Sequence, residues 1–171
     1  MNIKLLFLIP ALILSACSIP KATNVLFQPV QTIPANSSIV YFYRPEAYFN
    51  SAGWVELFID EEMKFALVNN SYGYVVLNEG DYDIKLEGSM WGTNWWPGPA
   101  TAKLSVASGR EIYVRILPLE PGTTIEMGAF EPILSFGART FGHFSKAHTD
   151  IRVMEKNLAL KEIRPTTLIE Q

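Results

Sequence analysis

Strict two-residue alternation runs through DYDIKLE at residues 81–87, where Tyr82, Ile84 and Leu86 are each flanked by charged side chains. Successive side chains of a β-strand point to opposite faces of the sheet, so this pattern predicts a strand with one buried face. The same alternation recurs in residues 55–59, 102–106 and 112–116. We therefore expect several strands that turn their apolar faces into one shared core.

Three further segments are apolar on both faces, as expected of central strands that are covered on either side. They are residues 40–43, 63–68 and 74–77. The connectors at 60–62, 78–80 and 107–110 are too short for parallel crossovers, which need about a dozen residues, and they predict hairpins. The sequence thus predicts at least seven strands in an all-β fold, an antiparallel β-sandwich of the immunoglobulin-like or transthyretin-like kind.

The C-terminal part of the chain carries a different pattern. Residues 151–153 predict a last strand, after which Met154, Leu158 and Ile163 fall on one helical face before Pro165, with Ala159 and Leu160 as further candidates for that face. We predict a short C-terminal helix and a tail over residues 165–171. Residues 123–127 are a further candidate strand, and residues 130–144, rich in glycine and aromatic side chains, predict irregular structure.

Composition limits the class of protein. The chain has 171 residues, 49% hydrophobic and 18% charged, which predicts one folded domain and excludes a disordered tail. A single cysteine excludes a scaffold of internal disulfides. The net charge of −3 gives no electrostatic support for a nucleic-acid partner.

The first residues resemble a secretory signal. Lys4 precedes an apolar run that ends at Leu14, and small side chains precede Cys17. The run has about ten residues, half of what a membrane-spanning helix needs, so a signal peptide over residues 1–16 is the better interpretation. A buried core helix and an ordinary cleaved signal with an incidental cysteine are the alternatives.

The tetrad Leu14-Ser15-Ala16-Cys17 resembles the lipobox of bacterial lipoproteins. The resemblance implies transfer of diacylglycerol to the Cys17 sulfur, cleavage before Cys17 and acylation of the new amino group. Ser18 follows the cysteine, and by resemblance to the sorting rule of enteric Gram-negative bacteria this implies the outer membrane, facing the periplasm. Residues 17–37 contain three prolines and predict an extended tether, of which the apolar residues 25–27 contact the domain.

Several short motifs resemble the bacterial lipoprotein family catalogued as domain of unknown function 2846. They are Ser38-Ile39-Val40-Tyr41-Phe42-Tyr43-Arg44-Pro45, Val55-Glu56-Leu57-Phe58-Ile59-Asp60, Leu67-Val68-Asn69-Asn70-Ser71-Tyr72-Gly73-Tyr74 and Asn78-Glu79-Gly80-Asp81-Tyr82. The resemblance covers roughly residues 38–164, our predicted domain, and departs at Glu61, where the family tends to have a glycine. It implies a β-rich domain on a lipid anchor and offers no catalytic residues.

The sequence offers few residues that could catalyse a reaction or bind a metal ion. Only His143 and His148 exist as histidines, and neither has a nucleophile elbow nearby, so we predict no catalytic residue and no enzyme. The spacing of these histidines and Asp150 leaves a weak zinc site as an alternative to our prediction of no metal and no cofactor. The acidic turn at residues 60–62 lacks the alternating carboxylates of a calcium loop.

The segment of residues 89–99 concentrates three of the four tryptophans among glycines and prolines. Its candidate ligand-binding residues are Trp91, Asn94, Trp95 and Trp96. Aromatic rings on a surface loop suit stacking on a sugar or gripping a peptide. The alternative is that the rings fold back as a lid over one end of the sandwich.

Two functions follow as hypotheses. The first is a lipid-anchored cell-envelope protein that acts as a non-enzymatic interaction module, with the membrane and an envelope protein as partners. The second is a module that binds a glycan or peptidoglycan through the tryptophan-rich loop. Buried tryptophans and an exposed strand edge favour the first, and exposed tryptophans favour the second.

Overall fold

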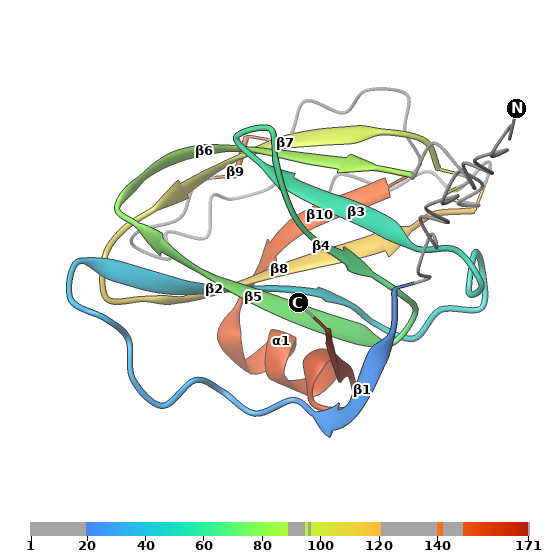
Figure 1. The fold of residues 1–171 in the computed structure, drawn as a ribbon, viewed down its shortest axis with the longest axis horizontal. Helices are drawn as coiled ribbons and strands as arrows, with labels where there is room; N and C mark the ends of the chain where they lie inside the picture. Colours follow the sequence, from blue (N-terminus) through green and yellow to red (C-terminus); the bar gives the residue numbers. More distant parts are fainter. Residues whose placement is uncertain (1–19, 89–94, 96, 121–139, 142–148, 171) are drawn as a thin grey trace, which may run out of the picture.

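A computed structural model describes residues 20–88, 95, 97–120, 140–141 and 149–170. Eleven strands in these residues form two packed sheets (Figure 1). The six-stranded sheet has the order β1 (Ala22–Leu26), β11 (Thr167–Ile169), β5 (Ser71–Asn78), β2 (Ser37–Arg44), β8 (Glu111–Pro118) and β10 (Thr149–Met154). The five-stranded sheet has the order β4 (Glu62–Leu67), β3 (Val55–Ile59), β6 (Gly80–Glu87), β7 (Ala100–Val106) and β9 (Thr140–Phe141).

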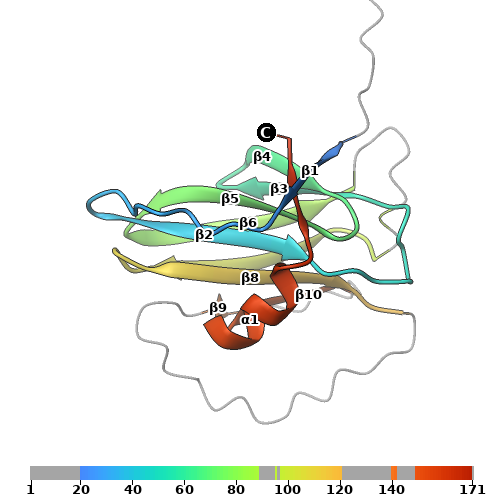
Figure 2. The same ribbon diagram turned by 90° about the horizontal axis from the view of Figure 1, so that it is seen from below.

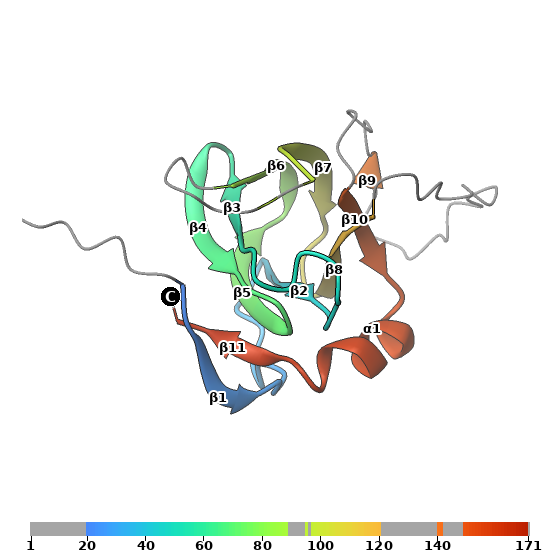
Figure 3. The same ribbon diagram turned by 90° about the vertical axis from the view of Figure 1, so that its right-hand side faces the viewer.

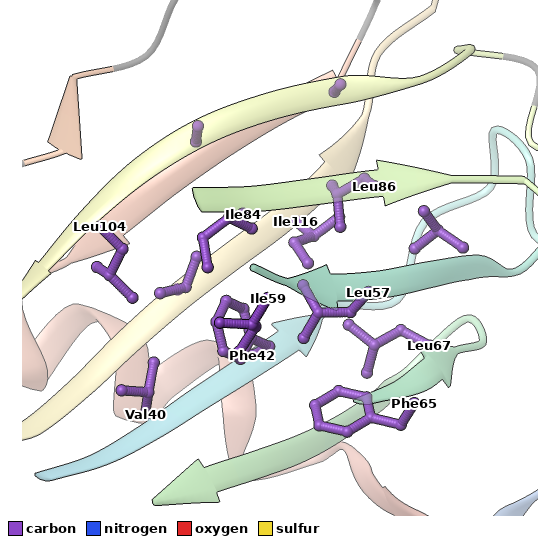
Figure 4. Close-up of a cluster of buried hydrophobic side chains, with 14 of the residues drawn as sticks. Val40, Phe42, Leu57, Ile59, Phe65, Leu67, Ile84, Leu86, Leu104 and Ile116 are labelled. Carbon is purple, nitrogen blue, oxygen red and sulfur yellow. The ribbon is translucent and has the colours of Figure 1, made fainter. Parts of the chain in front are cut away.

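The predicted all-β sandwich with a short C-terminal helix is confirmed, since the two sheets enclose a core and α1 covers Lys156–Ile163. Ile84 and Leu86 are buried between the sheets, and Tyr82 packs against the rim of the same cluster. Figure 4 shows Ile84 and Leu86 of β6 pointing toward Ile116 of β8. The face of β6 that the alternation predicted to be buried is therefore the face that packs in the core.

Strand direction is more varied than the sequence predicted. The five-stranded sheet is antiparallel throughout, but β2 pairs in parallel with β8, and β11 with β5. The hairpins predicted at residues 78–80 and 107–110 are wrong, because each of these links crosses from one sheet to the other. The link between β5 and β6 is the single residue Glu79, where the chain bends from one sheet into the other. The four-residue link between β7 and β8 spans the roughly 10 Å between packed sheets, so short length alone did not require a hairpin.

The third predicted hairpin, between β3 and β4, is present. Asp60 and Glu61 at its tip have φ values of 49° and 67°, the left-handed backbone that a tight hairpin turn of this kind requires. Glu61 therefore adopts a backbone conformation that glycine takes more readily. The Asp60 carboxylate accepts the backbone N–H of Asp83 at 2.9 Å, which ties the turn to β6.

The outer face of the six-stranded sheet carries a second apolar cluster. Helix α1 lies against this face near β8 (Figure 2), and the chain between β1 and β2 covers the neighbouring part. The cluster consists of Phe27, Ile39, Tyr41, Tyr43, Tyr72, Tyr113, Ala159 and Ile163. Strand β2 is therefore buried on both faces as predicted, and β5 is a central strand as predicted, although Val76 is about half exposed. Strand β4 is instead an edge strand with Met63 about half exposed, so the prediction was wrong for β4.

The C-terminal helix begins after Glu155, whose carboxylate accepts the backbone N–H groups of Asn157 and Leu158 at 3.0 and 3.2 Å. Ala159 and Ile163 form its buried face. Leu158, which the sequence placed on the apolar face, is half exposed, because the buried face is set by Ala159 and Ile163, four residues apart, and Leu158 lies beside it.

The sheet extends beyond residues 38–164 at both ends. Strand β1 lies within the predicted tether and pairs with β11, which lies within the predicted tail (Figure 3). The candidate strand at residues 123–127 lies outside the described residues. Within residues 130–144, the described pair Thr140–Phe141 forms β9 at the edge of the five-stranded sheet.

Candidate interaction site

The structure describes one of the four residues predicted to bind a ligand. Trp95 is 5% exposed and belongs to the core between the sheets, which is the lid position and not a surface platform. Trp91, Asn94 and Trp96 lie outside the described residues, as do Cys17, His143 and His148. Trp95 therefore closes one end of the sandwich.

Arg44, at the end of β2, is the polar partner of Trp95. Its guanidinium carbon lies 5.1 Å from the centroid of the Trp95 ring, and the side chain is completely buried. Burial lowers the pKa of Arg44 to about 10, which leaves it charged at neutral pH. No ion pair of Arg44 exists within the described residues, so the ring and backbone oxygens surround this charge.

The two donating ends of Arg44 hold the loop that follows β2. Nη1 donates to the carbonyl oxygen of Gly53 at 2.5 Å, and Nη2 donates to that of Asn50 at 2.6 Å. The loop is also closed by its own bond from the Gly53 N–H to the Asn50 oxygen at 3.0 Å. Hydrogen bonds from a buried charge are stronger than neutral ones, so the backbone of residues 45–54 is braced from within the core.

A second brace comes from the turn between β4 and β5. The backbone N–H of Ala47 donates to Oδ1 of Asn69 at 3.0 Å. Between the two braces, Tyr48 is 97% exposed. A hollow of about 490 Å³ lies beside it, lined by Glu46, Ala47, Tyr48, Ser51 and Asn69.

We take this loop, residues 45–54, as the candidate interaction site and call it the Tyr48 loop. It lies at the end of the sandwich where β2 ends (Figure 1). A rigidly held loop with an exposed aromatic side chain suits recognition, because tyrosine supplies a large contact area and a hydroxyl. Sequence reasoning missed Tyr48, since residues 45–54 carry no periodic pattern; the Arg44-Pro45 pair, which ends a strand, was the available signal.

The strand edges differ in charge. Strand β4 carries Glu62 and Lys64, and β10 carries Asp150 and Arg152, which are features that discourage added strands. Strand β1, ATNVL, has no charged residue, and Val25 and Leu26 are 47% and 56% exposed. An exposed strand edge was one of the features that favoured the interaction hypothesis.

A polar network fastens β10 and α1 to the sheet. Arg115 on β8 donates to Asp150 at 2.7 Å and to Glu162 at 3.1 Å, and the Tyr43 hydroxyl donates to Glu162 at 2.8 Å. Burial, and then the bond to Glu162, raise the pKa of Tyr43. Asp150, the carboxylate of the alternative zinc site, is buried and also pairs with Arg152 at 3.3 Å. Both carboxylate oxygens of Asp150 therefore pair with arginine side chains.

Within the described residues, no group of three or more metal-ligating side chains converges, and no helix is long and apolar enough to cross a membrane. The fold is a β-sandwich with one braced loop and with an edge strand, β1, that has no charged residue. Residues 34–129, more than half of the chain, match a family model described as protein of unknown function (DUF2846), and the chain belongs to this family. Neither a curated protein nor a solved structure matched the chain.

Proposed function

We propose that this protein is a lipid-anchored component of the cell envelope that acts as a non-enzymatic interaction module, and that its Tyr48 loop contacts a protein partner. Cys17 carries the lipid in this proposal, and the outer membrane, on its periplasmic side, is the expected location. The sandwich serves as a rigid holder for the loop.

The observation that carries the proposal is the contrast between Tyr48 and what lies beneath it. Tyr48 is almost fully exposed, while Arg44, which donates two hydrogen bonds to the backbone of the loop, is completely buried. A loop that is ordered before binding loses less conformational entropy on association than a flexible one. Nothing in the folding of the domain requires a tyrosine at this exposed position, so we assign it to binding.

The test is site-specific photo-crosslinking in intact cells. A photoreactive amino acid at position 48 should capture one dominant protein. The matched control is position 79, which is also exposed but lies in the link between β5 and β6, at the opposite end of the sandwich (Figure 1). Equal adducts at both positions, or none at position 48, would contradict the proposal.

A second candidate is glycan binding at the same loop, because the hollow combines the Tyr48 ring with the polar side chains of Glu46, Ser51 and Asn69. An aromatic ring beside hydrogen-bonding groups suits stacking on a sugar. Co-sedimentation with purified peptidoglycan separates the two candidates. A protein that sediments with peptidoglycan, and whose Tyr48→Ala variant does not, is a glycan-binding module; a protein that stays in the supernatant and crosslinks to a partner is not.

A further inference from the structure

We propose that the side of the sandwich formed by β1 and β4 faces the lipid bilayer, with Val25 and Leu26 in contact with the headgroup layer. This inference rests on the proposed lipid anchor at Cys17 and adds the orientation of the domain. It commits to the bilayer as the occupant of the uncharged edge.

The tether between the anchor and the sheet is short. Five residue steps separate Cys17 from Ala22, where β1 begins. A fully extended chain covers about 3.6 Å per residue, so the beginning of β1 lies at most about 18 Å from the lipidated residue. A domain of this size is roughly 35–40 Å across. The tether is therefore too short to let the domain turn over on its anchor.

Strand β1 cannot lengthen the tether by leaving the sheet without breaking bonds at both of its ends. The Lys21 carbonyl accepts the N–H of Glu170 at 3.1 Å, and the N–H of Phe27 donates to Thr166 at 3.0 Å. Phe27 itself is buried in the cluster on the outer face, where its ring lies 5.2 Å from that of Tyr41 and 5.1 Å from that of Tyr72. The anchored end of the chain is thus fixed to one particular side.

That side is defined by the sheet order. Strands β1 and β4 are the first strands of their two sheets, and Figure 3 shows β1, β11 and β4 on the same side of the molecule, away from β9 and β10. The side carries three exposed apolar side chains, those of Val25, Leu26 and Met63. Lys21 precedes β1 and is exposed, in a position to meet lipid phosphates.

A bilayer fits this edge better than a protein partner. The tether leaves a gap of about 18 Å at most, which is thinner than a folded domain. Apolar side chains near an anchor gain by entering the interface between headgroups and acyl chains. Strand β1 brings no charged side chain to this side, and the two charges of β4, Glu62 and Lys64, pair with each other at 2.6 Å, which lowers the cost of desolvating them.

The single cysteine makes the test direct. Once Cys17 carries lipid, an engineered cysteine is the only free thiol in the chain. The full lipidated protein is reconstituted into vesicles of phosphatidylethanolamine and phosphatidylglycerol, and the variant Val25→Cys is labelled with a polarity-sensitive fluorophore. The control is Thr101→Cys, an exposed position on β7, on the far side of the five-stranded sheet. We expect blue-shifted emission and quenching by spin-labelled lipid at position 25 only.

Flotation with the vesicles distinguishes a failure of the proposed lipid anchor from a failure of the proposed orientation. Protein that floats but carries a water-exposed label at position 25 overturns the orientation and leaves the anchor standing. Protein that does not float overturns both. A label that is shielded in cell membranes but water-exposed in pure lipid vesicles assigns the β1 edge to a protein partner, which also overturns the proposal. The variant pair Val25→Asp and Leu26→Asp should float like the parent and lose contact of a label at position 63 with lipid.

Discussion

The guanidinium carbon of Arg44 lies 5.1 Å from the centre of the Trp95 ring, and both residues are buried. Arg44 ends β2, while Trp95 lies in the link between β6 and β7, so the contact joins the two sheets at one end of the sandwich. A cation over an indole ring gains about 2 kcal/mol when both are desolvated. The pair therefore closes the core and places a charge beneath the Tyr48 loop.

Replacement of Trp95 should destabilise the domain. Trp95→Ala removes a large buried ring and should lower the free energy of unfolding by about 3–5 kcal/mol. Trp95→Phe, which keeps an aromatic face for Arg44, should lose clearly less. Denaturant midpoints of a soluble domain measure both, and an unchanged midpoint for Trp95→Ala would show that the ring does not close the core.

Replacement of Arg44 should loosen the Tyr48 loop. Arg44→Met fills similar space but removes both donors to the carbonyl oxygens of Asn50 and Gly53. We expect faster hydrogen exchange at the amides of Ser51 and Gly53, which donate within this loop, and an unchanged rate in β6. Arg44→Lys, which keeps one donor, should fall between. Equal exchange in all three proteins would mean that the loop is ordered without the arginine.

A charge on the inner face of β6 should unfold the sandwich. Ile84 is buried in the core, so Ile84→Asp places an unpaired carboxylate there at a penalty of several kcal/mol, comparable to the total stability of a small domain. Circular dichroism should show the β signal of the parent and its loss in the variant. Asp83→Asn, on the exposed face of the same strand, is the control and should fold.

Alkaline pH should destabilise the fold. Burial raises the pKa of four tyrosines above the ordinary value of 10, namely Tyr41, Tyr43, Tyr72 and Tyr113. Above pH 10 the unfolded chain releases phenolic protons that the folded chain keeps, so stability is complete below pH 10 and declines as the pH rises beyond it. Arg44, with its lowered pKa, acts in the opposite direction but is a single group.

Denaturant midpoints between pH 8 and 11.5 measure this decline. Tyr43→Phe should show a shallower decline, because one of the four buried phenols is gone. Midpoints of the parent protein that stay constant up to pH 11.5 would contradict the prediction.

Cys17→Ser should release the protein from membranes, because serine offers no thiol for lipid transfer. Fractionation and metabolic labelling with a fatty acid test this together. Ser18→Ala, one residue further along, is the control and should stay lipidated. Detergent-sensitive sedimentation of the Cys17→Ser variant would reject the lipoprotein assignment.

The sequence predicted those elements whose side chains face two different environments. Alternation located β3, β6 and β7, because each has one face in the core and one toward solvent. It also located the inner face of β8, although α1 covers the other face of that strand. Strand β11 has only three residues and is held in the sheet by its pairing with β5 and β1. Three residues are too few to show a two-residue hydrophobic period, so the sequence did not predict this strand. The links after β5 and β7 were predicted to be hairpins because they are short. This failed because the length of a link does not determine whether the next strand joins the same sheet or the other one.

The candidate site was harder to predict than the fold. Tryptophan density drew attention to residues 89–99, yet Trp95 is a core residue. The Tyr48 loop depends on hydrogen bonds from Arg44 and Asn69, and the latter is distant in sequence. Composition and spacing along the chain do not report such contacts.

Strand β1, the first of the described strands, has as its neighbour the last of them, β11, since Ala22 pairs with Ile169 and Leu26 with Thr167. Contacts between the two ends of a polypeptide form late, because nearly the whole chain must be closed into a loop first. Strand β1 thus has no partner strand until β11 has been synthesised. A premature stop codon just before Thr167 would delete β11 and leave β1 unpaired, so that a truncation after residue 166 would disturb residues 22–26, more than 140 positions earlier in the sequence.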